Sequence, residues 1–452
     1  MIDACAWLCS AGAFILAIYA IRTYGLIEGG RNVWIGVILL LPSWFNPPFG
    51  VTRIDPRSTC ALAFIICFLL QPYRRQERQF FFSDLAICLL MASLMVSQFL
   101  NAEFAPMPLI EQVRAFGFPY IVGRLFLRSV RDIETALPSI CIAISILSLL
   151  TIFEGVFAIN PIDKLLGKTW IIDEWTETQM RWGLKRANGP QSHPIYLGLT
   201  IGLMMPWLIE AARSSWRGEG KYWWRFVPFL AVVAVVCTGS RASQITVFLV
   251  FAFDFFHIHE RWRGLLIILA LSAGGIFFVN REEIISFLSE YAGEKSSTDS
   301  FVIINGQVYD YTGTKHRDLL TIVYEEQYEQ SGYFGYGMDK QRMPKDPNMD
   351  TRFESIDNHF LLFHLQYGLM GVIFFIMVAS SFILNLLPVI WSGQGATGRL
   401  AAGILGAITG SLISMRGVWF SSDYGLIWLF SGGVSVCLAQ LHRSPERATT
   451  TW

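Results

Sequence analysis

Long apolar segments, separated by shorter polar stretches, recur along the whole chain. A helix needs about 20 mainly apolar residues to span a bilayer, and candidate segments occur at 4–22, 33–48, 59–72, 81–101, 108–127, 137–159, 195–212, 226–240, 243–258, 264–280, 359–390, 399–415 and 421–441. Segment 33–48 is short and contains Pro42, and segment 108–127 contains Arg114 and Arg124, so we expect both to be tilted, broken or re-entrant. The pattern predicts an all-α integral membrane protein with about twelve or thirteen transmembrane helices.

Composition supports this class and excludes others. Hydrophobic residues make up 53% of the chain and charged residues only 15%, whereas soluble domains carry roughly 25% charged residues. Basic and acidic residues number 35 each, so the overall charge predicts no nucleic-acid partner. The eight cysteines form no CxxC pair, which argues against a zinc site or a disulfide framework. The N-terminus lacks the basic region of a cleaved signal peptide, so we expect the first apolar segment to remain.

Basic residues in short loops predict the orientation in the membrane, because such loops favour the cytoplasmic face. If the spans alternate, one side receives the basic stretches at 73–78, 128–131, 213–225, 260–264, Arg399 and 442–447. We expect that side to be cytoplasmic. Two long segments, roughly 160–194 and 281–357, then fall on the outer face.

The chain is therefore expected to divide into N-terminal transmembrane helices (1–159), an outer loop (160–194), central transmembrane helices (195–280), a large outer loop (281–357), C-terminal transmembrane helices (358–441) and a cytoplasmic tail (442–452). Within the large loop, residues 314–330 have the spacing of an amphipathic helix. Residues 331–340 follow as a turn rich in glycine and aromatic residues. Long loops in compact proteins are usually functional or disordered, and this one is not low in complexity.

Polar side chains that could carry chemistry gather on the predicted outer face. They are Lys185, Arg186 and His193 before one span, Arg241 in a tight turn between two spans, Arg317 in the loop helix, Tyr336 in the glycine–aromatic turn, and Asn358 and His359 at the start of another span. One guanidinium group can bind two phosphate oxygens at the same time. A histidine titrates near neutral pH and can accept a proton from a hydroxyl group. The set suits transfer from a lipid diphosphate to an alcohol.

Each residue also has a plainer interpretation. Arg241 caps a helix or binds a lipid headgroup, Arg186 is a solvated loop charge, and His193 and His359 end a loop or cap a helix. The carboxylates of the large loop show no regular ligand spacing, and the chain has no HExxH, DxD or glycine-rich phosphate loop. We therefore expect no metal, nucleotide or other cofactor.

Several of these stretches carry a family resemblance, which covers roughly residues 180–390. "TGSRAS" (238–243), "HRDLL" (316–320), "YFGYGMD" (333–339) and "DNHFLLFHLQYGLMGV" (357–372) occur in this order, with "RANGPQSHPIYLG" (186–198) upstream. Together they resemble the shared region of the O-antigen ligase and O-antigen polymerase superfamily, multi-span glycosyltransferases of the GT-C type. Gln366 departs from the family pattern, because many relatives have a carboxylate there.

The resemblance implies a metal-independent reaction on glycan linked to undecaprenyl diphosphate, at the periplasmic face of the bacterial inner membrane. Arg186 and Arg241 match the family's diphosphate-binding arginines, His359 its candidate general base, and Arg317 the basic residue of the loop helix. We expect Lys185, His193, Asn358 and Tyr336 to contribute further contacts to the substrate. His359 would then project at the membrane surface toward the arginines.

The acceptor stays open between members of this family. A polymerase transfers glycan onto another lipid-linked repeat unit of O-antigen or exopolysaccharide, a ligase onto lipid A core, and a third kind of relative onto protein. We favour the polymerase slightly, working with membrane lipids and other polysaccharide assembly proteins. A transporter of lipid-linked oligosaccharide is the alternative from another class, since it would also bind diphosphate through arginines.

Overall fold

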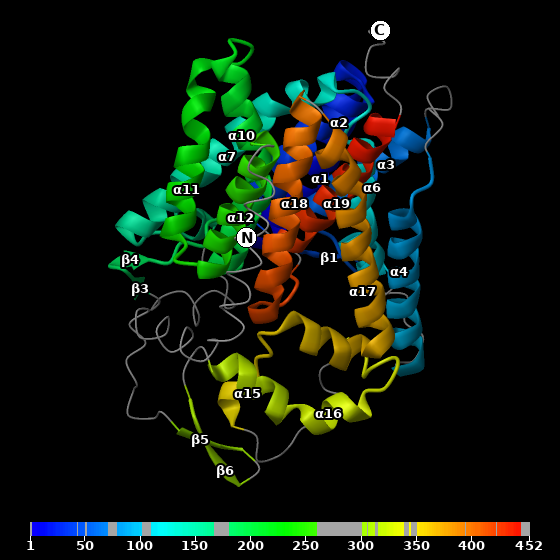
Figure 1. Cartoon of the computed structure of the whole chain (residues 1–452), viewed down its shortest axis with the longest axis vertical. Helices are drawn as coiled ribbons and strands as arrows, with labels where there is room; N and C mark the ends of the chain where they lie inside the picture. Colours follow the sequence, from blue (N-terminus) through cyan, green and yellow to red (C-terminus); the bar gives the residue numbers. More distant parts are fainter. Residues whose placement is uncertain are drawn as a thin grey trace.

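The computed structural model of the chain is a bundle of helices with a smaller helical region at one end (Figure 1). The structure describes residues 2–42, 44–49, 52–70, 79–101, 110–166, 180–259, 301–304, 306–311, 315–338, 343–344, 350–393, 395–421 and 423–443. Its strands form only three two-stranded antiparallel hairpins in this part of the chain, so the fold is all-α.

The N-terminal part of the bundle consists of α1 (Ile2–Tyr24), α2 (Leu26–Leu40), α3 (Pro56–Leu69), α4 (Phe82–Asn101), the π-helical turn η2 (Val113–Gly117), α6 (Phe118–Leu125) and α7 (Arg131–Phe157). A short hairpin of β1 (Pro48–Phe49) and β2 (Thr52–Arg53) precedes α3. Pro42 lies just beyond the end of α2, and the segment around Arg114 begins as a π-helical turn rather than a regular helix. Both segments are therefore too short or irregular to be simple spans, as their sequences predict.

The remaining elements of the bundle follow α8 (Pro161–Leu166) and a hairpin of β3 (Met180–Arg181) and β4 (Leu184–Lys185). They are α10 (Pro194–Trp216), η3 (Tyr222–Phe226), α11 (Val227–Cys237), α12 (Arg241–Ile258), α17 (His359–Ser392), α18 (Gly395–Ser414), η7 (Met415–Gly417) and α19 (Tyr424–Arg443). Helices α10 and α19 are buried along most of their length and form the centre of the bundle. Glycines permit the closest approaches: a Cβ at Gly406 of α18 would lie 2.6 Å from a carbonyl oxygen of α12.

The predicted spans are largely confirmed as helices but not in their number. Each predicted apolar segment within the described residues contains helix, whereas 264–280 lies outside them. Among the described residues, eight helices are long and apolar enough to cross a membrane, and the apolar helices Pro56–Leu69 and Tyr222–Cys237 are shorter. The chain is thus a multi-pass membrane protein, with fewer full-length spans in its described part than the predicted twelve or thirteen.

Charged side chains within the bundle are paired, as desolvated charges must be. Bidentate pairs join Arg399 to Glu210 and Arg213 to Asp254, and Arg124 binds Asp84 through two nitrogens. These pairs lie near the helix ends on the side of the C-terminus. Arg213 and Arg399, which belong to the basic stretches that predict the cytoplasmic side, therefore also form ion pairs that hold the helices together.

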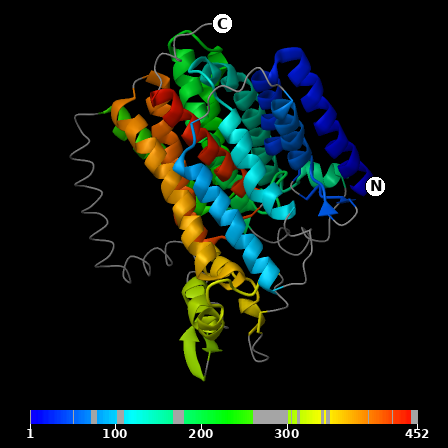
Figure 2. The ribbon, with the colours of Figure 1, turned by 90° about the vertical axis from the view of Figure 1, so that its right-hand side faces the viewer.

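The smaller region lies at the end of the bundle opposite the C-terminus (Figures 1 and 2). It contains the hairpin β5 (Phe301–Ile304) and β6 (Gln307–Asp310), α15 (Lys315–Val323), α16 (Glu325–Gln330) and η6 (Thr351–Phe353). The amphipathic helix predicted at 314–330 is confirmed as α15 and α16. Leu320, Tyr324 and Phe353 form its core with Leu362 and Leu365 from the first turns of α17. The large loop and the C-terminal tail are therefore attached to opposite ends of the bundle.

Helix α17 is broken at Gly368, which has φ 67° and ψ −169°, a region that essentially only glycine occupies. The glycine–aromatic turn at 332–337 runs alongside the break and pairs with it through the hydrogen bonds Tyr336 N to Leu365 O (2.8 Å), Gly337 N to Gln366 O (2.8 Å), Leu369 N to Gly332 O (3.1 Å) and Met370 N to Tyr333 O (3.1 Å). The turn thereby satisfies peptide groups that the break releases. It also fastens the smaller region to the short first half of α17.

We predict that Gly335→Ala destabilises the protein more than Gly332→Ala. Both glycines have positive φ, but a Cβ at Gly335 would lie 2.5 Å from the backbone of Gln366, whereas nothing lies within 4 Å of one at Gly332. The φ strain costs about 1–2 kcal/mol in both variants, and the clash adds about 1–3 kcal/mol in the first alone. Thermal unfolding in detergent, followed by tryptophan fluorescence, measures the difference. Equal melting temperatures would show that the turn does not press against α17.

Candidate functional site

The hairpin β3–β4 brings two basic positions to the start of α10. Its turn residues Trp182 and Gly183 have φ 53° and 77°, the combination of a type I′ turn that joins two short strands tightly. Arg181 pairs with Leu184 in this hairpin, and Arg186 follows directly after β4. The hairpin therefore places Arg181 and Arg186 close together. Of the two, only Arg186 is predicted from the sequence as a site residue.

Both arginines lie on the turn between α11 and α12. Arg186 Nε donates to the carbonyl of Thr238 at 3.2 Å, and Arg181 donates to the carbonyl of Gly239 at 2.6 Å. Gly239 has φ 61°, and a Cβ there would lie 3.1 Å from Arg186 Cγ. Arg241 begins α12 directly after this turn. Glycine is thus required for the backbone to approach both side chains.

Three further guanidinium groups act on Arg186. Burial, which is the larger cause, and then the positive charges of Arg181, Arg241 and Arg317 together lower the pKa of Arg186 to about 10. Like charges gathered in a partly desolvated place oppose folding and favour an anion. The structure thus places Arg241 and Arg317 within electrostatic range of Arg186, and it adds Arg181 to them.

Arg317 reaches the site from the smaller region. A Cβ at Gly417 would lie 2.8 Å from Arg317 Cζ, so the guanidinium packs directly on the backbone of η7. The neighbouring Arg416 pairs with Asp318 at 3.5 Å, and both side chains are exposed. The first helix of the loop thus docks onto the segment between α18 and α19. Nothing in the local pattern of the sequence singles out Arg416, since it becomes relevant only through this docking.

A buried carboxylate positions the segment around Arg186. Glu154 of α7 is fully buried and accepts hydrogen bonds from the backbone N–H groups of Asn188 (3.2 Å) and Gly189 (2.8 Å). Lys185 lies 3.6 Å from the same carboxylate. The predicted substrate contact Lys185 is therefore engaged within the protein, where it offsets the charge of Glu154.

Three further predicted contacts act in the fold. The Nδ1 atom of His193 accepts from Ile195 N at 3.2 Å and caps α10, and Asn358 Oδ1 accepts from Leu361 N at 3.2 Å and caps α17. Tyr336 donates its hydroxyl group to Gln327 O at 3.1 Å. The plainer interpretation as caps and packing contacts accounts for these side chains in this structure. Burial, and then the charge of Arg186, lower the pKa of His193 to about 4.

His359 is placed differently from its prediction. The side chain is only 3% exposed, and its ring is surrounded by Phe360, Phe363, Phe375 and Phe420. The expectation that its side chain projects at the membrane surface is therefore wrong. The reason is that the first half of α17 packs inward under the smaller region, so the first turn of the helix faces the bundle core.

Residues 416–421 and Asp423 link the separate parts of the site. Gly417 supports Arg317, and Phe420 N donates to His359 Nδ1 at 3.3 Å. Asp423 is buried and lies 3.4 Å from Arg57 of α3, and it accepts a hydrogen bond from Ser192 N at 3.1 Å.

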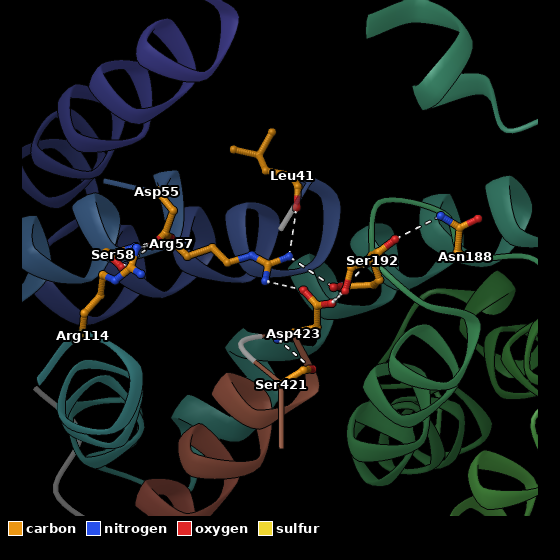
Figure 3. A network of polar contacts seen from close by, with 10 residues as sticks. Leu41, Asp55, Arg57, Ser58, Arg114, Asn188, Ser192, Ser421 and Asp423 are labelled. Carbon is orange, nitrogen blue, oxygen red and sulfur yellow. Dashed lines mark hydrogen bonds and ion pairs between the residues drawn. The ribbon is translucent and has the colours of Figure 1, made fainter. Parts of the chain in front are cut away.

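Figure 3 shows Arg57 extended between the carbonyl of Leu41 and the carboxylate of Asp423, with Ser192 on the far side of that carboxylate. Asp55 and Arg114 pair at 2.6 Å beside Arg57 and line a small cavity of about 40 Å³. The buried pair of Arg57 and Asp423 therefore connects the N-terminal helices to both segments that border the arginines.

The fold and the site define a multi-pass, all-α membrane protein with an arginine-rich site at one end of its bundle. No family model matches the chain, and no curated protein matches it. Within the part of the chain that the structure describes, no group of three or more His, Cys, Asp or Glu side chains is arranged to hold a metal ion.

We predict that Glu154→Ala is strongly destabilising. The change leaves two buried N–H groups and Lys185 without the carboxylate, and loss of one partner of a buried charge pair costs about 3–5 kcal/mol. Glu134→Ala on the same helix is the control, because Glu134 is exposed and its loss is expected to change stability by about 0.5 kcal/mol or less. Melting temperatures in detergent test this, and similar values for both variants would contradict the anchoring role.

We also predict that acid weakens the cap of α10. The pKa of His193 in the folded protein, about 4, lies below its ordinary value of 6.5. The unfolded chain therefore binds the proton first as pH falls, so stability is lost between about pH 6.5 and pH 4, by at most about 1.4 kcal/mol per pH unit. His193→Asn keeps a capping side chain without the titration. Its melting temperature is expected to fall less than that of the wild type between pH 7 and pH 5, and parallel falls would refute the assignment.

Proposed function

We propose that the chain is a glycosyltransferase that moves glycan from undecaprenyl diphosphate to a hydroxyl acceptor at the periplasmic face of the bacterial inner membrane. The single observation that supports this best is the convergence of Arg181, Arg186, Arg241 and Arg317 at one end of the bundle. The order of motifs in the sequence supports an enzyme like the O-antigen ligases and polymerases.

The charge of the site favours a diphosphate over a single carboxylate or phosphate. Each guanidinium can bind two oxygens of a phosphate group, and a diphosphate offers several guanidinium groups more acceptor oxygens than a single carboxylate or phosphate does. The site also lies at the end of apolar helices, so a polyprenyl tail can stay in the bilayer while its headgroup reaches the arginines. A lipid diphosphate satisfies both conditions.

The proposed reaction joins an acceptor hydroxyl oxygen to the anomeric carbon of the donor glycan. The bond from that carbon to the diphosphate oxygen breaks, its electron pair leaves with the diphosphate, and the hydroxyl proton passes to the departing diphosphate. The arginines stabilise the charge that develops on the leaving group. No metal or nucleotide is required for this exchange of bonds.

The acceptor that we favour is a second lipid-linked repeat unit, which makes the chain a repeat-unit polymerase. A polymerase needs only one kind of substrate, so purified protein given lipid-linked oligosaccharide alone is expected to form a ladder of longer lipid-linked glycans. Product that forms only after addition of lipid A core would instead identify a ligase. Absence of product with both acceptors, together with flipping of the donor in liposomes, would replace the enzyme with a transporter.

We predict that Arg186→Gln and Arg241→Gln each lower the turnover by about 10–100-fold, because one charge-assisted hydrogen bond to phosphate is worth about 1.5–3 kcal/mol. The assay uses purified protein in detergent, lipid-linked oligosaccharide from the native host and a chelator, without nucleotide. Arg22→Gln is the matched control, since Arg22 is exposed at the end of α1, and it is expected to retain full turnover. Full turnover in the two site variants at normal folding would contradict the proposal.

A further inference from the structure

The hydrogen bond to His359 determines where the imidazole proton lies. A backbone N–H group can only donate, so the His359 nitrogen that faces Phe420 N, Nδ1 at 3.3 Å, must present a lone pair. In the neutral ring the proton is then on Nε2. His359 is therefore held as the tautomer whose outer nitrogen is a hydrogen-bond donor.

The Nε2 atom is buried and has no hydrogen-bond partner among the residues that the structure describes. A buried donor without an acceptor costs about 1–3 kcal/mol, and an acceptor oxygen supplied by a ligand would remove this cost. Phe363 and Phe375 are buried beside it, at 4% and 1% exposure, whereas Phe360 and Phe420 are partly exposed.

This arrangement disfavours His359 as a general base. The Nδ1 lone pair is occupied by Phe420 N–H, and Nε2 carries the proton, so neither nitrogen offers a free lone pair to a hydroxyl group. The charged imidazolium would direct Nδ1–H at Phe420 N–H, and the rings that surround it are uncharged. An apolar shell of this kind favours the neutral ring.

We propose that His359 acts in the reaction as a hydrogen-bond donor, through Nε2–H, to an oxygen of the substrate's diphosphate. This rests on the proposed function. The segment that contacts His359 through Phe420 also contacts Arg317 through Gly417, three residues earlier, which connects the donor to the arginines. No proton is transferred, and the hydrogen bond strengthens as negative charge develops on the leaving oxygen.

Three substitutions separate a donor from a base. The side-chain amide of His359→Gln places an N–H group near the position of Nε2. In His359→Asn the amide is shorter, so its oxygen replaces Nδ1 as acceptor for Phe420 N–H while the Nε2 donor is lost. His359→Ala removes both. We expect the Gln variant to turn over within about tenfold of the wild type, and the Asn and Ala variants to lose about 100-fold or more.

A Gln variant as inactive as the Asn variant, with equal melting temperatures, would overturn the donor role and support a base.

A second measurement does not depend on turnover. The chain has seven histidines, and the signals of His359 in a spectrum of ¹⁵N-histidine-labelled protein are identified by their loss in His359→Gln. We expect a neutral ring with the proton on Nε2 at neutral pH. A proton on Nδ1, or an imidazolium, would overturn the inference whatever the activity.

These two measurements also distinguish the inference from the function on which it rests. If the wild type shows the expected tautomer but turns over no lipid-linked glycan with either acceptor, the proposed function fails, and the use of His359 on a diphosphate fails with it. If the wild type is active and the tautomer is wrong, only the inference about His359 fails.

Discussion

Peptide groups within a bilayer need hydrogen-bond partners from the protein itself, and the break in α17 shows how this constraint organises the molecule. Gly368 interrupts the helix, and the glycine–aromatic turn supplies the partners that the interruption requires. The same hydrogen bonds attach α15 and α16 to the bundle. Arg317 is on α15 and His359 is on the first half of α17, so the positions of both residues depend on this attachment.

The arginines repel one another, so the protein must hold them by other contacts. Backbone carbonyls of the turn at Thr238 and Gly239 accept hydrogen bonds from two guanidiniums. Glu154 accepts hydrogen bonds from the backbone of Asn188 and Gly189, which follow Arg186. The buried pair of Arg57 and Asp423 joins α3 to the segment before α19, and Asp423 also binds Ser192. An anionic ligand would offset the repulsion among these guanidinium groups.

Much of this arrangement could be predicted from local patterns. Apolar segments located the helices, the spacing at 314–330 located the loop helix, and the positions of Arg186, Arg241 and Arg317 indicated one face. The number of transmembrane helices was harder to predict, because α2 and α3 are apolar but too short to count as full spans. The membership of Arg181 depends on a hairpin between two-residue strands, which is too short for a periodic signal.

The burial of His359 and its hydrogen bond to Phe420 could not be predicted from the sequence either. They depend on contacts between residues about sixty positions apart, and no spacing rule within one helix reports them. Local sequence therefore indicated which residue types gather at the site, whereas tertiary packing decided which of them face a ligand. The family resemblance suggested a base at His359, and the backbone donor at Phe420 instead favours a hydrogen-bond donor.

The central claim is that the clustered arginines bind a lipid diphosphate, and direct binding of undecaprenyl diphosphate without glycan tests it most simply. Native mass spectrometry or a radiolabelled lipid gives the dissociation constant for the wild type, Arg186→Gln, Arg241→Gln and the control Arg22→Gln. We predict binding by the wild type and the control that weakens about 10–100-fold in each site variant, and weaker binding of undecaprenyl monophosphate. Equal affinity in all four proteins, or no preference for the diphosphate, would contradict the account.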